Sequence, residues 1–157
     1  MAPDPLHMAE ISDQFDHMKH QEDTTYKPCD YLKKWMEAEQ DGSGTGVPER
    51  NASCTSGITE EWREKIVNWS YDIADFYHFN RETVYISLSY LDRFLATRST
   101  KMNNTSFQLA AVTTINLAIK LYEHNKMDHR TLVGLCRGKF QLEDIERMEM
   151  VIMRYVD

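Results

Sequence analysis

Two histidines and two aspartates near the N-terminus have the spacing of metal ligands on one face of a helix. His17 and His20 are three residues apart, and Asp13 and Asp16 precede them. Imidazole nitrogens and carboxylate oxygens at such spacings can bind Zn²⁺. The surrounding residues 1–27 are acidic and hold few large apolar side chains, which is typical of a solvated, disordered tail. We favour the tail over a metal site.

Other charged side chains occur where the apolar periodicity of a helix predicts buried positions. Arg63 follows Trp62 directly, and the apolar run YLDRFL is interrupted by Asp92 and its neighbour. Lys120 ends an uncharged stretch, and Glu149 lies on the apolar stripe of the last predicted helix. A buried charge is costly unless it is paired. These residues therefore need partners, unless each one reaches water at the edge of its helix.

The sequence contains no pattern that predicts an enzyme. We find no nucleophile with a suitably spaced base, no glycine-rich phosphate loop and no specific metal-ligand cluster, so we assign no catalytic residue and no cofactor. The net charge of −7 gives no basic footprint for nucleic acid. The cysteines are Cys29, Cys54 and Cys136, widely spaced and odd in number. Together with the missing signal-peptide pattern, they argue for a reducing, intracellular location.

The stretch from Met102 to Ile119 is the most apolar part of the chain. We expect the helices that carry these charges to pack around it. It carries no charge, and its second half, LAAVTTINLAI, is apolar on nearly every side. Such a helix is either enclosed by other helices or lies in a membrane. A membrane span needs about 20 mostly apolar residues, whereas this stretch also contains Asn, Gln, Ser and Thr. We therefore predict a central helix surrounded by others, and no membrane segment.

Composition divides the chain into four parts. Residues 1–57 hold eleven acidic and five basic side chains, whereas the rest of the chain is nearly neutral. Residues 1–27 are the predicted disordered tail, and PCDYLKKWMEAEQ at 28–40 predicts a short N-terminal helix. Residues 41–57 are rich in Gly, Ser and Thr, which predicts a flexible linker. Residues 58–157 are then one globular domain.

Apolar side chains at helical spacing predict five helices in this domain, and no alternating pattern predicts a strand. Residues able to cap the first four helices at their N-termini are, in chain order, Thr59, Asn80, Thr105 or Ser106, and Asp128. The fifth helix covers residues 141–156. We therefore predict an all-α domain of five helices packed around the third.

Several motifs in this helix order resemble the cyclin box. They are an Arg after Trp62 on the first helix, YLDRFL on the second, QLAA and LAIK on the third, and IERMEMVIM on the fifth. The segment YLKKWMEAE resembles the extra N-terminal helix that precedes the box. The sequence is thus identified as a member of the cyclin family, carrying an N-terminal cyclin box. This implies a non-catalytic subunit that activates a cyclin-dependent kinase in cell-cycle progression, located in nucleus and cytoplasm.

The resemblance also assigns roles to the charged residues at positions predicted to be buried. It implies that Arg63 and Asp92 form a buried structural ion pair, and that Lys120 and Glu149 contact the kinase. Further kinase contacts that it implies are Leu117, Leu121, Met150 and Met153 around this pair, and Tyr31 and Leu32 on the N-terminal helix. For Leu117, plain core packing is the alternative.

A groove for substrates or inhibitors that carry an Arg-x-Leu peptide is implied as well. The matching positions are Trp62, Lys65, Ile66, Trp69, Asp72 and Gln108. Lys65 stands where the family usually has an apolar residue, and Trp62 is bulkier than the common Met. The groove is therefore either lost or specific for a different peptide, and Ile66 and Trp69 can also be simple core residues.

Two other classes of function fit the helix order. One is a cyclin-box scaffold of the transcription-factor type, without kinase activation, and the other is a helical adaptor that binds peptides on the Trp62–Trp69 face. Lys120 and Glu149 together favour the kinase partner over the scaffold. Many cyclins continue into a second helical fold, whereas this chain stops after the fifth helix. We therefore expect a fragment or an incomplete product.

Overall fold

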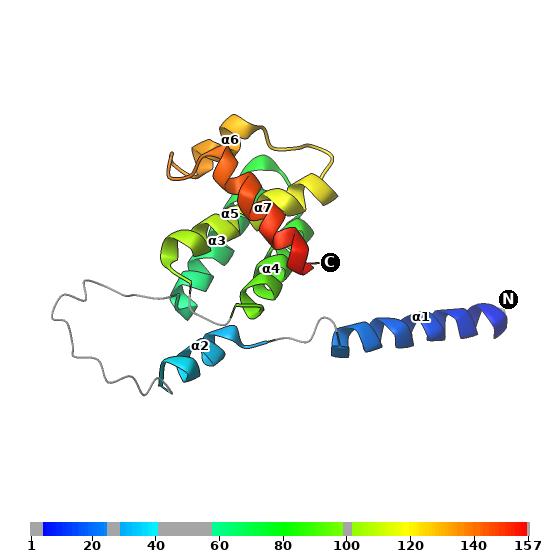
Figure 1. The fold of residues 1–157 in the computed structure, drawn as a ribbon. Coiled ribbons are helices and arrows are strands. Elements are labelled where there is room, and N and C mark those ends of the chain that lie inside the picture. Colours follow the sequence, from blue (N-terminus) through cyan, green and yellow to red (C-terminus); the bar gives the residue numbers. More distant parts are fainter. Residues whose placement is uncertain (1–4, 25–28, 41–57, 99–101, 157) are drawn as a thin grey trace.

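The computed structural model describes residues 5–24, 29–40, 58–98 and 102–156, and these form helices without any strand (Figure 1). In chain order the helices are α1 (Pro5–Thr24), α2 (Tyr31–Gln40), α3 (Glu60–Tyr77), α4 (Arg81–Ala96), α5 (Asn104–Tyr122), α6 (His129–Leu135) and α7 (Leu142–Val156). Helices α3 to α7 correspond to the five predicted for the globular domain. The all-α prediction is confirmed.

Helix α5 occupies the centre of the domain. Its residues 110–119 are all buried, including the polar Thr113, Thr114 and Asn116. The two threonine hydroxyls donate to backbone carbonyls of the same helix, at 2.7 Å from Leu109 and 3.0 Å from Ala111, so they stay satisfied without water. Helices α4, α7 and α3 pack around α5. The uncharged stretch is thus the enclosed central helix, as predicted.

The N-terminal caps explain where the helices begin. Asn80 accepts from the backbone N–H of Glu82 at 3.0 Å and Asp128 from that of Thr131 at 2.8 Å, as predicted for α4 and α6. Thr59 occupies the cap position of α3 in an extended conformation, but its side chain makes no capping hydrogen bond.

The predicted cap of α5 is wrong. Neither Thr105 nor Ser106 caps this helix, because both lie inside its first turn. Asn103 holds the cap position, and its side-chain oxygen accepts from the backbone N–H of Ser106 at 2.7 Å. The helix therefore starts two or three residues earlier than the hydroxyl residues suggested.

The N-terminal region differs in part from the prediction. Residues 5–24 form helix α1, whereas the composition of residues 1–27 predicted a disordered tail. The segment has Pro5 at the first helical position and neither Gly nor Pro afterwards, so the backbone can adopt a helix on local preference. The described side chains of α1, residues 12–24, are all exposed.

Helix α2 packs against the domain through two aromatic side chains. Tyr31 and Trp35 are 4% and 1% exposed, and the indole N–H of Trp35 donates to the backbone oxygen of Arg98 at 3.2 Å. This helix falls within the predicted range 28–40. The predicted linker, residues 41–57, lies outside the described residues.

The described residues bear on the membrane and metal-site alternatives raised above. No helix among them is long and apolar enough to cross a membrane. No group of three or more His, Cys, Asp and Glu side chains in the described part of the chain is arranged to hold a metal ion.

Removal of the α5 cap should destabilise the domain. Asn103→Ala leaves the N–H of Ser106 without its acceptor, and we expect the free energy of unfolding to fall by about 1 kcal/mol. Urea denaturation followed by circular dichroism measures this change. Thr105→Ala is the matched control, because the exposed Thr105 does not cap the helix. An equal loss in both variants would contradict the assignment of Asn103 as the cap.

Candidate functional site

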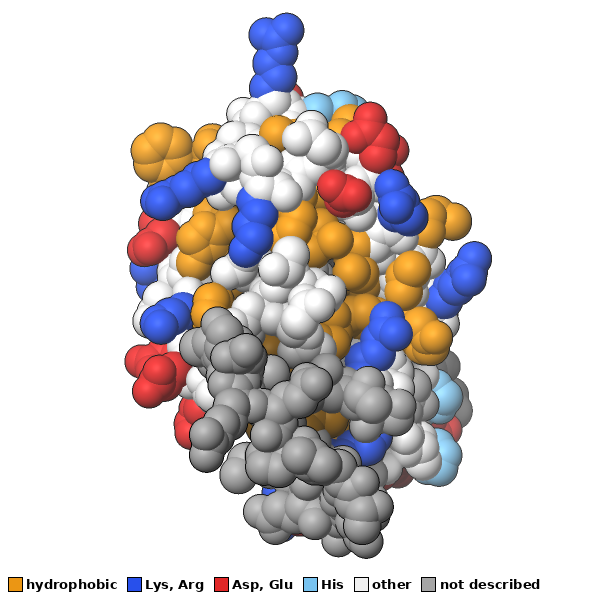
Figure 2. Space-filling model, turned by 60° about the vertical axis from the view of Figure 1, so that its left-hand side comes forward, with side chains coloured by type: hydrophobic (Ala, Val, Ile, Leu, Met, Phe, Trp, Pro, Cys, Tyr) orange, Lys and Arg blue, Asp and Glu red, His pale blue; other side chains and the backbone are white. Residues whose placement is uncertain are grey.

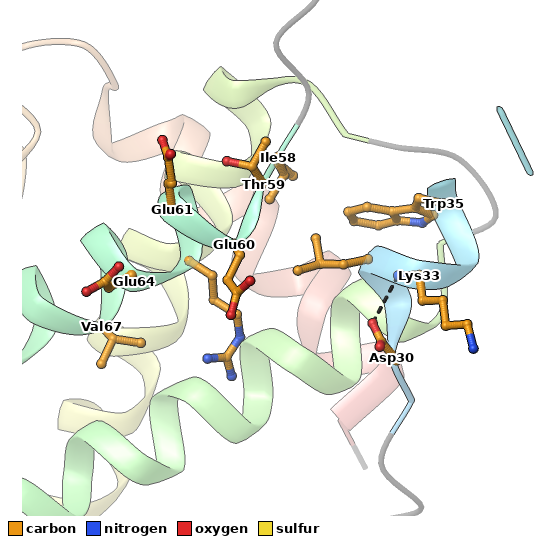
Figure 3. A pocket seen from close by; sticks show the side chains of 11 residues that line it. Asp30, Lys33, Trp35, Ile58, Thr59, Glu60, Glu61, Glu64 and Val67 are labelled. Atoms are coloured by element: carbon orange, nitrogen blue, oxygen red, sulfur yellow. Dashed lines mark hydrogen bonds between the residues drawn. The ribbon is translucent and has the colours of Figure 1, made fainter. Parts of the chain in front are cut away.

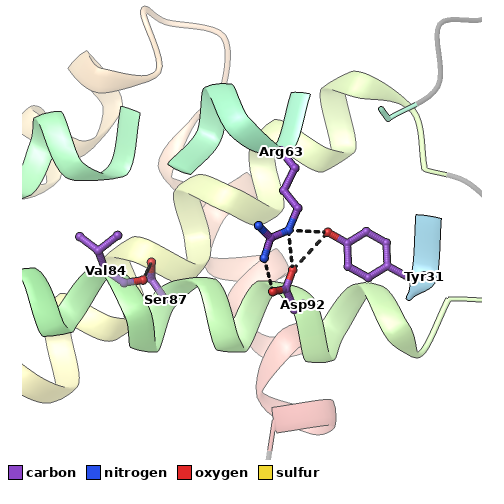
Figure 4. Close-up of polar contacts among 5 residues, drawn as sticks. All are labelled: Tyr31, Arg63, Val84, Ser87 and Asp92. Atoms are coloured by element: carbon purple, nitrogen blue, oxygen red, sulfur yellow. Dashed lines mark hydrogen bonds and ion pairs between the residues drawn. The ribbon is translucent and has the colours of Figure 1, made fainter. Parts of the chain in front are cut away.

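Arg63, Asp92 and Tyr31 form a polar cluster that joins three helices (Figure 4). The guanidinium of Arg63 on α3 donates through Nε to Asp92 Oδ1 on α4 at 3.2 Å, and through Nη2 to the second carboxylate oxygen. Arg63 Nε also lies 3.1 Å from the hydroxyl oxygen of Tyr31 on α2, and that hydroxyl donates to Asp92 Oδ1 at 3.1 Å. The cluster therefore connects α2 to α3 and α4.

The surroundings of this cluster shift two pKa values. Burial raises the pKa of the Tyr31 hydroxyl well above its usual range, and the nearby Asp92 carboxylate adds to this effect, while Arg63 opposes it. The pKa of Arg63 is raised chiefly by its hydrogen bond to Asp92. The Arg63 and Asp92 side chains are 34% and 35% exposed, so the ion pair is half-buried rather than fully buried as the resemblance implied.

Two of the predicted partner contacts lie in the core. Tyr31 is 4% exposed and holds the polar cluster, and Leu117 is 3% exposed within α5. Both side chains therefore offer little surface to another protein, and their contact with a kinase stays a prediction. Leu32 is half-buried and packs against the hydrophobic core cluster to which Tyr31 and Leu117 belong.

Lys120 and Glu149 lie together at one end of the domain. The Lys120 ammonium at the end of α5 is 2.7 Å and 3.0 Å from the two carboxylate oxygens of Glu149 on α7. The backbone oxygen of Lys120 accepts from the ammonium of Lys126 at 2.7 Å, which fixes the last turn of α5.

Large apolar side chains are exposed beside this ion pair. Leu121 follows Lys120 and is 55% exposed, while Met150 follows Glu149 and is 63% exposed. Met153, one turn further along α7, is 40% exposed. We call these five residues the Lys120–Glu149 face. Apolar side chains exposed around a charged pair are typical of a protein-binding surface.

A second feature is a groove of about 510 Å³ between α3, the first half of α5 and the α6–α7 connection. Five of the six predicted docking residues line it: Trp62, Lys65, Ile66, Trp69 and Gln108. The sixth, Asp72, is exposed on α3 and does not line the groove. We call this cavity the Trp62 groove.

Half of the groove was not predicted from the sequence. Its remaining lining residues are Val112, Leu135, Cys136, Arg137, Lys139 and Phe140. Most of them lie in the α6–α7 connection, about 70 residues after Trp62, and no spacing rule links segments that far apart. The backbone at Arg137 and Gly138 is left-handed, with φ of 50° and 71°. This turn lies within the connection that lines the cavity together with α3.

Cys136 forms part of the groove wall, and its thiol is buried and hydrogen-bonded. Its Sγ donates to the backbone oxygen of Leu132 at 3.3 Å, and burial raises the pKa of the thiol. Its position is therefore structural.

An acidic hollow of about 1100 Å³ lies between α2 and the start of α3 (Figure 3). Its acidic lining residues are Asp30, Glu60, Glu61 and Glu64. Asp30 accepts from the backbone N–H of Lys33 at 2.9 Å, so it caps α2. Glu60 and Glu61 lie in the first turn of α3, where negative charge stabilises the helix. Asp30, Glu60 and Glu61 thus have local structural roles.

Comparison with known proteins gives one family and several relatives. Residues 13–157 match the family model described as "Cyclin, N-terminal domain". G1/S-specific cyclin-E1 of Danio rerio is 27% identical over 110 residues, which are 70% of this chain and 26% of that protein. G1/S-specific cyclin-E of Caenorhabditis briggsae is 29% identical over 97 residues, 62% of this chain and 19% of that protein.

A third relative is Cyclin-D1-1 of Arabidopsis thaliana, 30% identical over 107 residues, which are 66% of this chain and 31% of that protein. The chain thus spans between 19% and 31% of the length of these relatives.

Breaking the polar cluster should weaken the fold. Asp92→Ala leaves the Arg63 guanidinium and the Tyr31 hydroxyl without their acceptor, and we expect the free energy of unfolding to fall by about 2 kcal/mol. A double-mutant cycle with Arg63→Ala should give a coupling energy above about 0.5 kcal/mol. Asp75→Ala is the control, because it breaks an exposed ion pair with Arg81. A cycle with no coupling would contradict the proposed linkage.

The Tyr31 hydroxyl should make stability fall at alkaline pH. Its pKa in the folded chain lies above the unfolded value of about 10. Because folding favours the neutral hydroxyl, its stabilising contribution is complete below about pH 10 and is lost as the pH rises further. Denaturation at a series of pH values should therefore show a steeper alkaline loss for the parent chain than for Tyr31→Phe. Parallel curves would show that the hydroxyl is not buried in the cluster.

Proposed function

The chain belongs to the cyclin family, and we propose that it is a non-catalytic regulatory subunit that binds and activates a cyclin-dependent serine/threonine kinase in cell-cycle progression. The observation that carries this proposal is the Lys120–Glu149 face. It combines a charged pair with exposed apolar side chains from the end of α5 and the second half of α7, two helices that pack together.

The geometry of this face suits the capture of a helix. The Lys120 side chain is 42% exposed and that of Glu149 is 20% exposed, so both can be reached by a partner. An ammonium has three donors and a carboxylate has about four acceptor positions, so each group keeps free hydrogen-bonding capacity within the pair. Charge-assisted hydrogen bonds to backbone groups of the partner would fix its register.

The apolar part of the face supplies contact area. Met150 and Met153 have flexible side chains that can adapt to another surface, and Leu121 extends the apolar area on the α5 side. Leu117 is only 3% exposed and so offers a partner little surface. The proposed contact surface is therefore smaller than the one implied by sequence.

The proposed mechanism involves no chemistry on this chain. Kinase activity requires an ion pair between the Lys of strand β3 and the Glu of the mobile αC helix of the kinase. A subunit that binds this helix only in its active position shifts the kinase population toward the active state. The shift is limited by the difference in affinity of this chain for the two kinase conformations.

We also propose that the Trp62 groove docks short peptides of substrates or inhibitors. It exposes the aromatic and aliphatic side chains of α3 next to polar groups, a combination typical of peptide-binding clefts. Docking on this groove would leave the Lys120–Glu149 face available to the kinase, because the two surfaces share no residue.

Kinase binding should depend on the charged pair. We expect Lys120→Ala/Glu149→Ala to weaken binding to a cyclin-dependent kinase at least about tenfold, because it removes hydrogen bonds made inside the interface. Pull-down and titration calorimetry against a kinase panel measure this, with helicity checked by circular dichroism. Asp75→Ala/Arg81→Ala is the matched control, since it removes an ion pair of similar geometry on α3 and α4.

Equal kinase binding by the parent and the Lys120→Ala/Glu149→Ala variant would contradict the assigned interface. A control variant that loses binding to the same extent would show that the effect is not specific to this face. Binding of no kinase in the panel by the parent would count against kinase regulation and favour the scaffold class.

A further inference from the structure

The Trp62 groove carries positive charge and no carboxylate. Lys65, Arg137 and Lys139 are its charged lining residues, and all three side chains are exposed. In the described part of the chain, none of them takes part in any of the ion pairs. The charges are therefore available to a ligand.

These cations lie against the aromatic walls of the groove. The Lys65 ammonium is 5.5 Å from the centre of the Trp62 ring, and the Lys139 ammonium is 5.8 Å from that of Phe140. Lys139 also donates to the neutral side-chain oxygen of Gln108. A ligand with an apolar side chain on these rings would thus meet an ammonium beside it.

Lys65 comes from α3, whereas Arg137 and Lys139 come from the α6–α7 connection. In Figure 1 this connection lies on the left of the domain, which is the side that Figure 2 brings forward. Figure 2 shows exposed hydrophobic side chains between Lys and Arg side chains on that side. Cations on two walls of an apolar cavity favour a ligand with carboxylates on both sides of its apolar anchor.

We propose that the Trp62 groove binds an acidic peptide of a partner protein, with Leu or Phe anchors flanked by Asp or Glu. This inference rests on the peptide-docking role proposed above and specifies the chemistry of the peptide. It reverses the charge of the Arg-x-Leu ligand implied by the family resemblance. An arginine of such a ligand would meet Lys65, Arg137 and Lys139, whereas Asp72 does not line the groove.

Two synthetic peptides test the proposal on the full chain. The acidic probe is Asp-Glu-Leu-Asp-Phe-Leu-Glu-Asp, and the basic probe has Lys or Arg at each acidic position. Fluorescence anisotropy of labelled probes gives the affinities. The intrinsic fluorescence of Trp62 and Trp69 reports binding in the groove, because the third tryptophan, Trp35 on α2, is buried and does not line the groove. We expect the acidic probe to bind at least about tenfold more tightly at about 0.15 M salt, and more weakly as salt increases.

Two variants locate the binding site. Arg137 has φ of 50°, a conformation that glycine adopts without strain, so Arg137→Gly removes the charge without straining the backbone. Lys65→Glu reverses the charge at the exposed wall of the groove. We expect either change to weaken the acidic probe about tenfold. Arg130→Glu is the matched control, because Arg130 is exposed on α6 and does not line the groove.

One helix of the chain itself has the same character as the acidic probe and is therefore a candidate competitor for the groove. Helix α1 is acidic, and its apolar Phe15 and Met18 are 54% and 58% exposed. The probes are therefore also measured on Phe15→Asp/Met18→Asp. Stronger binding of the acidic probe to this variant would support the proposed polarity and identify α1 as an internal competitor.

Tighter binding of the basic probe would overturn the proposed polarity and leave peptide docking intact. Binding of neither probe, to the parent or to Phe15→Asp/Met18→Asp, would overturn both. An acidic probe unaffected by Arg137→Gly and Lys65→Glu would place its site elsewhere and overturn the assignment. Kinase binding through the Lys120–Glu149 face is measured separately, so its failure is distinguishable from each of these results.

Discussion

The burial of α5 is the constraint on which the rest of the domain depends. Ten consecutive residues of this helix, 110–119, are buried, so other helices must cover it on all sides. Its two ends emerge at opposite surfaces with different chemistry. Gln108 and Val112 near the beginning line the Trp62 groove, whereas Lys120 at the end belongs to the Lys120–Glu149 face. One enclosed helix therefore separates and orients both candidate sites.

Charged groups on otherwise apolar helix faces hold the surrounding elements in register. The Arg63–Asp92 pair joins α3 to α4, and the Tyr31 hydroxyl brings α2 into the same cluster. The Lys120–Glu149 pair joins α5 to α7 in the same way. The Arg63–Asp92 pair has a further hydrogen-bond partner within the chain, the Tyr31 hydroxyl. The Lys120–Glu149 pair is instead bordered by exposed Leu and Met side chains. This difference in surroundings separates a structural ion pair from a candidate binding pair.

Local sequence patterns were sufficient to predict helices α2 to α7 and most of the residues at the N-terminal cap positions of helices α3 to α6. The uncharged stretch before Lys120 identified the central helix, because a helix without a polar face must be enclosed. The cap of α5 was misplaced because three neighbouring polar residues can all accept from a backbone N–H, and only the observed geometry selects Asn103. The helix α1 was missed because its composition resembles that of a disordered segment, although its local propensity permits a helix.

The sequence by itself determined the fold class, the order of the helices and the pairs of charges that needed partners, because helical periodicity and the cost of burying a charge are local properties of the chain. Only the tertiary structure decided which of these residues a partner can reach. Tyr31 and Leu117 became core residues, since the burial of a side chain depends on the helices packed over it. The positive charge of the Trp62 groove likewise required the fold, because Lys65 and Arg137 are brought to one cavity from segments about 70 residues apart.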